Sequence, residues 1–159
     1  MALQTAIRHP ERVRKLVLIS APCKRHGFYP EVLADMAQIG PEWARFMSQS
    51  PLSQLYPEAN WGTLFGKLGD LLRQDYDWSQ EAAAIKPPVM LVCADADTVR
   101  LAHALEFFAL LSGGQRDGGL DGSGKPGGRL AILPGRTHYD ILTFPALAGM
   151  VTSFLDATM

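Results

Sequence analysis

Several features are scarce in this sequence of 159 residues, and each scarcity excludes a class of protein. Two cysteines, Cys23 and Cys93, are too few for the disulfide framework of a small secreted domain. No apolar run reaches the roughly 18 residues that a membrane-spanning helix requires. Residues 1–9 lack the hydrophobic stretch of a signal peptide. These absences predict a reducing, cytoplasmic location without a membrane.

Neither sign of charge dominates the chain. It contains 15 basic and 16 acidic residues, which gives a net charge of −1 at neutral pH. Proteins that bind nucleic acid or an anionic membrane surface usually carry basic patches or stripes, and the sequence contains none. Nucleic acid and membranes are therefore excluded as expected partners.

Motifs for metals and cofactors are also missing. No group of His, Cys, Asp and Glu shows the spacing of metal ligands. Eight of the 15 glycines lie in residues 112–128, but this segment lacks G-x-x-x-x-G-K-[ST] and follows a predicted helix instead of a strand. A flexible surface loop is predicted there. We expect neither a metal nor a cofactor.

Strands and helices alternate in the parts of the chain that have a clear pattern. Short apolar runs predict buried strands, and helical spacing of apolar residues predicts the helices beside them. The predicted strands are 15–20, 88–93 and 129–133, and the predicted helices are 2–9, 99–111 and 144–157. This order predicts an α/β fold with a partial parallel sheet of about three strands and right-handed crossovers.

Residues 24–85 interrupt this alternation, because prolines divide them into short pieces and no strand pattern occurs. Apolar residues at helical spacing predict helices over 31–39, 42–50 and 61–76. We therefore predict a helical insertion at 24–85, with residues 1–23 and 86–159 forming the sheet-containing core.

An acidic residue and a histidine follow two consecutive predicted strands. Asp97 comes shortly after residues 88–93, and His138 comes shortly after residues 129–133. Both are expected near the carboxyl ends of parallel strands, which is where ligands bind in open α/β sheets. A histidine titrating near neutral pH can take and return a proton, and a carboxylate fixes its tautomer. The pair predicts an acid–base site.

Structural roles are the alternatives for these residues. Asp97 would also cap the helix predicted at 99–111, and His138 would fit a turn in which it bonds the backbone. Asp95 is a second candidate for the acid, although a turn carboxylate is the better interpretation of it. The strand-then-turn context favours Asp97 as acid and His138 as base.

The whole chain resembles the C-terminal half of an α/β-hydrolase, in which the triad order is Ser, then Asp or Glu, then His. Residues 6–13 (AIRHPERV) and the following KLVLIS are similar to the family's stretch just past the nucleophile. The resemblance implies that the strands are the sixth to eighth and that residues 24–85 form the cap. It further implies hydrolysis of an ester or related acyl bond through a serine acyl-enzyme, with Asp97 and His138 as triad acid and base.

The chain departs from the family pattern: no G-x-S-x-G nucleophile motif occurs in it, and the early loop that supplies half of the family's oxyanion hole is also absent. The expected chemistry needs a serine and an oxyanion hole from elsewhere, for example from a complementing N-terminal half. The other hypothesis is a non-catalytic, truncated product. Such a product would fold by self-association through the exposed edge of its first strand, as a homodimer or other homo-oligomer.

Substrate contacts are predicted for Trp43, Met47 and Tyr139, which would line an apolar pocket under the cap for a small ester-like substrate. The alternative is that the aromatic residues and methionines form the insertion's own core. Cys23 is interpreted as an inert small residue and Cys93 as a buried strand residue. The remaining histidines, expected at helix ends or on the surface, are His9, His26 and His103.

Overall fold

The computed structural model describes residues 1–158, which form two compact units. A sheet unit contains Met1–Phe28 and the segment from Asp77 onward, and a helical unit contains Tyr29–Tyr76. The segments that flank the helical unit pack with the sheet unit: the Trp78 N–H donates to the Cys23 carbonyl at 2.9 Å. The helical unit is therefore shorter at both ends than the predicted insertion at 24–85.

Within residues 1–158, the sheet unit is built on a three-stranded parallel sheet in the order β1-β2-β3. The strands are β1 (Leu16–Ile19), β2 (Val89–Ala96) and β3 (Arg129–Thr137). In β2 every residue from Val89 to Ala94 is buried, as expected for a continuous apolar run in a sheet that is covered on both faces. The predicted α/β class with a partial parallel sheet is confirmed.

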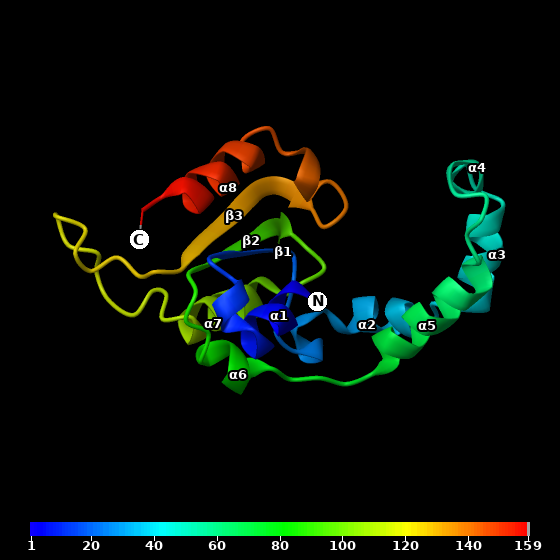
Figure 1. Ribbon diagram of the computed structural model, residues 1–159, viewed down its shortest axis with the longest axis horizontal. Coiled ribbons are helices and arrows are strands. Elements are labelled where there is room, and N and C mark those ends of the chain that lie inside the picture. Colours follow the sequence, from blue (N-terminus) through cyan, green and yellow to red (C-terminus); the bar gives the residue numbers. More distant parts are fainter. Residues whose placement is uncertain (159) are drawn as a thin grey trace. The chain divides into compact units, whose positions relative to one another are not determined.

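Helices cover both faces of this sheet (Figure 1). One face packs against α1 (Ala2–Arg8), α6 (Ser79–Ala83) and α7 (Leu101–Leu110), and the other packs against α8 (Leu147–Asp156). Alternate residues of β2 enter the two cores, with Leu91 on the α7 side and Val92 on the α8 side. Short 3₁₀ turns complete the unit: η1 (Pro10–Arg12), η2 (Arg25–Gly27) and η3 (Ile141–Thr143).

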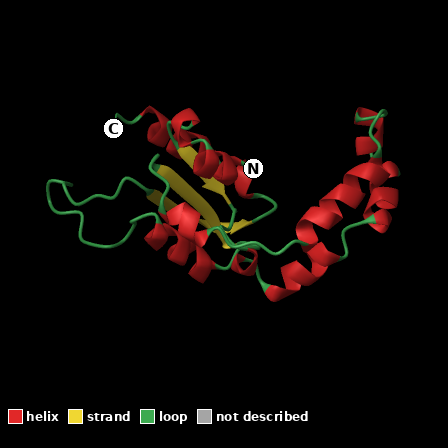
Figure 2. Cartoon of the chain, turned by 60° about the horizontal axis from the view of Figure 1, so that its bottom comes forward, coloured by secondary structure: helices red, strands yellow, loops and turns green. Residues whose placement is uncertain are grey.

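The helical unit contains α2 (Pro30–Ala37), α3 (Pro41–Ser48), α4 (Leu52–Leu55) and α5 (Trp61–Arg73) (Figure 2). Pro30 and Pro41 occupy first turns, where the missing N–H is tolerated. The Asn60 side chain caps α5 by accepting a hydrogen bond from the Thr63 N–H at 2.9 Å. No helix in residues 1–158 is long and apolar enough to cross a membrane.

Aromatic side chains hold α3 and α5 of this unit together. The rings of Trp43 and Phe65 stack with their centroids 6.5 Å apart, and Trp61 packs against Phe65 at 6.4 Å. Phe65 is buried, whereas Trp43 is 46% exposed. Part of the aromatic content of the insertion thus forms its own core, and part faces outward.

Candidate active site

Asp97 and His138 meet at the carboxyl ends of β2 and β3. The distance between Asp97 Oδ1 and His138 Nδ1 is 3.3 Å. The Asp97 side chain is 1% exposed, while that of His138 is 39% exposed. A buried carboxylate therefore contacts one nitrogen of an imidazole that solvent can reach from outside.

The Asp97 carboxylate is held by hydrogen-bond donors on both oxygens. Oδ2 accepts from the Ser20 hydroxyl at 2.6 Å and from the Ala94 N–H at 3.0 Å, and Oδ1 accepts from the Val99 N–H at 3.3 Å. Burial alone would raise the pKa of Asp97, but the hydrogen bonds from His138, Ser20 and the backbone hold this pKa well below its ordinary value. The group is consequently a fixed anion at neutral pH.

Helix capping does not account for Asp97. Helix α7 begins at Leu101, its N-cap residue is Arg100, and no side chain bonds the first-turn N–H groups there. The alternative of a helix N-cap is therefore wrong, because Asp97 lies three residues before the cap, where it contacts the strand ends.

A backbone irregularity in β3 brings His138 to the acid. Pairing with β2 is interrupted between Ala94 and Ala96 and resumes at Thr137, so β3 extends beyond the predicted end at residue 133. Gly135 lies in this irregularity with a φ of 65°, a left-handed conformation that glycine adopts without strain.

Asp95 braces this irregularity. Its carboxylate accepts hydrogen bonds from the Gly135 N–H at 2.9 Å and the Arg136 N–H at 3.2 Å, and these bonds lower the pKa of Asp95. Asp95 is exposed, and its hydrogen bonds join the β2 end to the β3 end. The interpretation of Asp95 as a turn carboxylate agrees with these contacts.

Solved structures with a similar arrangement of strands and helices include several hydrolases. Carboxylesterase CesB from Bacillus subtilis matches with a TM-score of 0.64 and 21% identity, over 99% of this chain and 56% of the esterase. MGS-M2, an α/β hydrolase enzyme from a deep-sea metagenome library, matches with a TM-score of 0.58 and 15% identity, over 99% and 62%. The chain has the α/β-hydrolase fold. The resemblance stated from the sequence is confirmed at the level of the fold.

The match covers nearly all of this chain but only part of each solved structure. The enol-lactonase from Burkholderia xenovorans, with a TM-score of 0.57 and 16% identity, is matched over 98% of this chain but 61% of its own. The chain thus spans about 60% of the length of these α/β-hydrolase structures. No protein-family model and no curated protein matches the sequence.

Ser20 also belongs to the candidate site around Asp97, although the sequence analysis gave it no role. It follows β1, is 8% exposed and donates its hydroxyl to the acid. A serine nucleophile instead donates to the histidine, so this geometry does not make Ser20 the nucleophile. The available sequence signal was weak: a serine at a strand end before Ala21 and Pro22.

The predicted substrate contacts are divided between the two units. Tyr139 is 87% exposed, and its ring meets the His138 ring edge-on with 5.5 Å between centroids. Trp43 and Met47 lie on α3 in the helical unit, where Trp43 is exposed and Met47 is half-buried. The substrate-binding role of all three stays a prediction.

A cavity of about 840 Å³ lies elsewhere in the sheet unit. Its lining includes Met90, Leu130 and Phe154, at the amino ends of β2 and β3 and under the last turns of α8. Asp97 and His138 do not line this cavity. We therefore do not assign it to the acid–base site.

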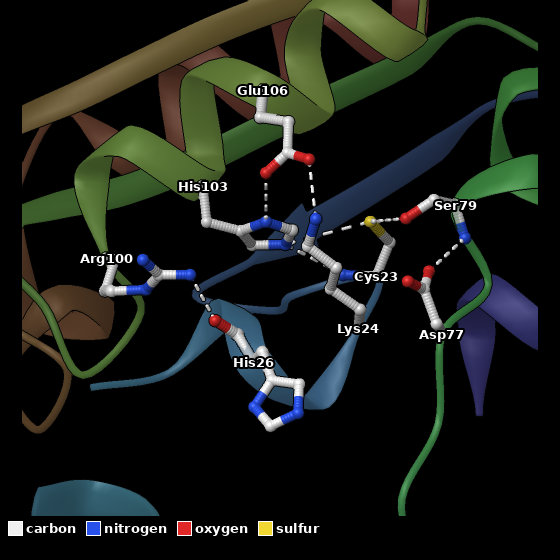
Figure 3. Close-up of polar contacts among 8 residues, drawn as sticks. All are labelled: Cys23, Lys24, His26, Asp77, Ser79, Arg100, His103 and Glu106. Atoms are coloured by element: carbon white, nitrogen blue, oxygen red, sulfur yellow. Dashed lines mark hydrogen bonds and ion pairs between the residues drawn. The ribbon is translucent and has the colours of Figure 1, made fainter. Parts of the chain in front are cut away.

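A second polar cluster joins the segment after β1 to α7 (Figure 3). His103 Nε2 accepts from the Cys23 N–H at 3.3 Å, and Nδ1 lies 3.2 Å from Glu106 Oε2. Glu106 also pairs with Lys24. Because Nε2 is an acceptor, Nδ1 carries the proton and donates to Glu106.

His103 lies in the first turn of α7, at a helix end as expected, but it is 1% exposed, so a surface position is wrong for it. It faces the core because the segment around Gly27 covers this side of α7: a Cβ on Gly27 would lie 2.3 Å from the His103 ring. Burial lowers the pKa of His103 and raises the pKa of the Cys23 thiol. Both shifts favour the uncharged form of the two groups at neutral pH.

The hydrogen bonds of Asp97 predict an acid-dependent loss of stability. The pKa of Asp97 is lower in the folded chain than in the unfolded one, so its contribution is complete above the unfolded value of about 3.9 and is lost as pH falls toward the folded value. We expect Asp97→Asn to flatten the fall of the unfolding free energy below about pH 4, measured by urea unfolding at several pH values. The exposed Asp35→Asn is the control. An unchanged slope in Asp97→Asn would contradict this expectation.

Proposed function

We propose that this chain supplies the acid and the base of a serine hydrolase that cleaves an ester or related acyl bond. The observation that carries the proposal is the contact between buried Asp97 and solvent-accessible His138 at the carboxyl ends of adjacent parallel strands. Structures with the same fold include a carboxylesterase and an enol-lactonase, which supports this reaction class.

In this proposal the two residues divide the proton chemistry. Asp97 accepts a hydrogen bond from the Nδ1–H of His138, which leaves Nε2 for the reacting groups. His138 takes the proton of the serine hydroxyl as the acyl bond is attacked and then donates it to the leaving alcohol. A water molecule is activated in the same way to release the acyl group. The fixed negative charge of Asp97 stabilises the imidazolium that forms in between.

The nucleophile and the oxyanion hole would come from a segment outside these 159 residues. In residues 1–158, β1 pairs with β2 alone. The N–H groups of Leu16 and Ser20 point toward β2 and donate to the carbonyls of Pro88, just before β2, and Val92 at 3.0 and 2.8 Å. Because bonding direction alternates along a strand, the N–H and C=O groups of Val17 and Ile19 point to the open edge. A further strand, carried by a segment with the nucleophile, fits there.

The substrate proposed for this site is small and apolar. Tyr139 lies directly beside His138 and would contact the acyl or alcohol part of an ester. No charged group is needed to bind such a substrate, and none is assigned to this role.

The test is labelling with a fluorophosphonate, which reacts with activated serines, on the assembly purified under mild conditions from its source cells. We expect label on a serine of a segment outside these 159 residues, together with a product burst from an activated ester. Mass spectrometry identifies the labelled peptide, and light scattering gives the mass of the assembly. An assembly without label and without hydrolysis would refute the proposal.

Self-association without catalysis is the second candidate, and the open edge of β1 favours it. An apolar strand with unpaired backbone groups is a template for pairing with another chain. Two copies would then join through their β1 edges as a homodimer, and the same edge would not be free for an N-terminal segment.

Val17→Pro tests this second candidate. Proline removes the N–H on the open side of β1, where a sheet edge tolerates it, and leaves the bonds of Leu16 and Ser20 to β2. If the chain self-associates through β1, light scattering should give twice the 17.4 kDa chain mass for the unmodified chain and the single mass for the variant. Val17→Ala, which keeps the N–H, is the matched control. A variant mass that stays doubled excludes this edge.

A further inference from the structure

Ser20 has a backbone conformation that its residue type rarely adopts. Its φ is 50°, in the left-handed region that favours glycine. A strained residue at a strand end persists when the surrounding structure requires it, and such residues gather at functional sites. This conformation occurs at the end of β1, where the Ser20 N–H still donates to the Val92 carbonyl of β2 at 2.8 Å.

The hydroxyl of Ser20 makes a short, charge-assisted hydrogen bond. It donates to Asp97 Oδ2 at 2.6 Å, in a site where Ser20 is 8% exposed. Bonds of this length from a hydroxyl to a carboxylate are among the stronger ones in proteins. The two residues are 77 positions apart, so the bond fixes the end of β1 to the loop after β2.

The two carboxylate oxygens of Asp97 accept hydrogen bonds from different donors. Oδ2 accepts from the Ser20 hydroxyl and the Ala94 N–H. Oδ1 accepts from the Val99 N–H and from the Thr98 hydroxyl at 3.4 Å, and it faces His138. Loss of the Ser20 hydroxyl would leave Oδ2 with the Ala94 N–H, and rotation of the carboxylate would then be less restricted.

We propose that Ser20 is a positioning residue, which holds Asp97 in the orientation that presents Oδ1 to His138. It acts through the acid and does not touch the reacting atoms. The proposal rests on the proposed function, because the orientation of His138 matters for catalysis only if His138 is the base. The left-handed turn at Ser20 is the backbone geometry that brings its hydroxyl to the acid.

The test measures the tautomer of His138 and the acid titration of Asp97 by NMR in the isotope-labelled 159-residue chain. At about pH 9, where imidazoles are neutral, we expect the wild type to hold the proton on Nδ1. Ser20→Gly removes the hydroxyl and tolerates the left-handed backbone. In this variant a substantial Nε2–H population should appear, and the Asp97 carboxyl should titrate at a higher pH than in the wild type.

Ser112→Gly is the matched control, because Ser112 is an exposed serine with a φ of 62° outside the site. It should leave both signals unchanged. Circular dichroism checks that each variant is folded, and Ser20→Ala is measured as a second variant that lacks the hydroxyl.

Two outcomes separate the proposals. If Asp97→Asn shifts the tautomer while both Ser20 variants behave as the wild type, the role of Ser20 is refuted and the acid–base pair stands. If Asp97→Asn leaves the tautomer unchanged, the acid–base pair itself fails, and the positioning role fails with it.

Discussion

His138→Ala is expected to lower kcat for an activated ester by about 10⁴-fold or more in the serine-containing assembly proposed above, because the base is removed. Asp97→Asn should lower kcat by about 10⁴-fold, because an amide at this position favours the wrong imidazole tautomer. In both variants KM should change far less than kcat, since neither group is expected to hold the substrate. Steady-state kinetics measures the two parameters separately.

His9→Ala is the control for these variants. His9 lies after α1 in the sheet unit, with a side chain 64% exposed and paired loosely with Glu11. Its removal should leave kcat within about twofold, because exposed pairs of this kind contribute little. Loss of activity in all three variants would indicate damage to the fold, and unchanged activity in His138→Ala would refute the proposed mechanism.

Phe107→Ala is expected to lower the unfolding free energy of the chain by about 3–5 kcal/mol, the range for a large buried aromatic side chain. Phe107 is 1% exposed and belongs to the core between α1, α7 and the sheet. Its ring also stacks on that of His103, with 6.2 Å between centroids. A loss of this size is a large part of the roughly 5–15 kcal/mol that stabilises a typical domain. Urea unfolding followed by circular dichroism measures it.

Leu105→Ala on the same helix provides the comparison. Leu105 is 49% exposed, so its truncation should change the unfolding free energy by less than about 0.5 kcal/mol. Equal effects at positions 105 and 107 would mean that α7 does not present the face described here to the core.

The secondary structure followed from local pattern. The apolar run at 15–20 and the continuous run at 88–93 predicted buried strands, and β1 and β2 occupy those positions. Periodicity is a property of neighbouring residues, so one sequence suffices to read it. The end of β3 was missed because the irregularity around Gly135 depends on backbone N–H groups donating to the carboxylate of Asp95, which lies 40 residues away.

The pairing of Asp97 with His138 was also within reach of the sequence. Each follows a strand, and parallel strands bring their carboxyl ends to one edge, so proximity followed from topology. The two residues are 41 positions apart, but the predicted parallel strands place both of them at the same edge of the sheet. The choice between acid and helix cap, however, needed the actual start of α7 at Leu101.

The sequence by itself determined the α/β class, the parallel strands and the candidate acid and base. Tertiary structure alone decided which further side chains reach them and which are buried. Ser20 reaches the acid across 77 residues, and His103 is buried because the chain around Gly27 folds over α7. Such contacts depend on the backbone dihedral angles of all the residues between the two positions. Local propensity and periodicity do not predict those angles closely enough, whereas packing in the folded state fixes them.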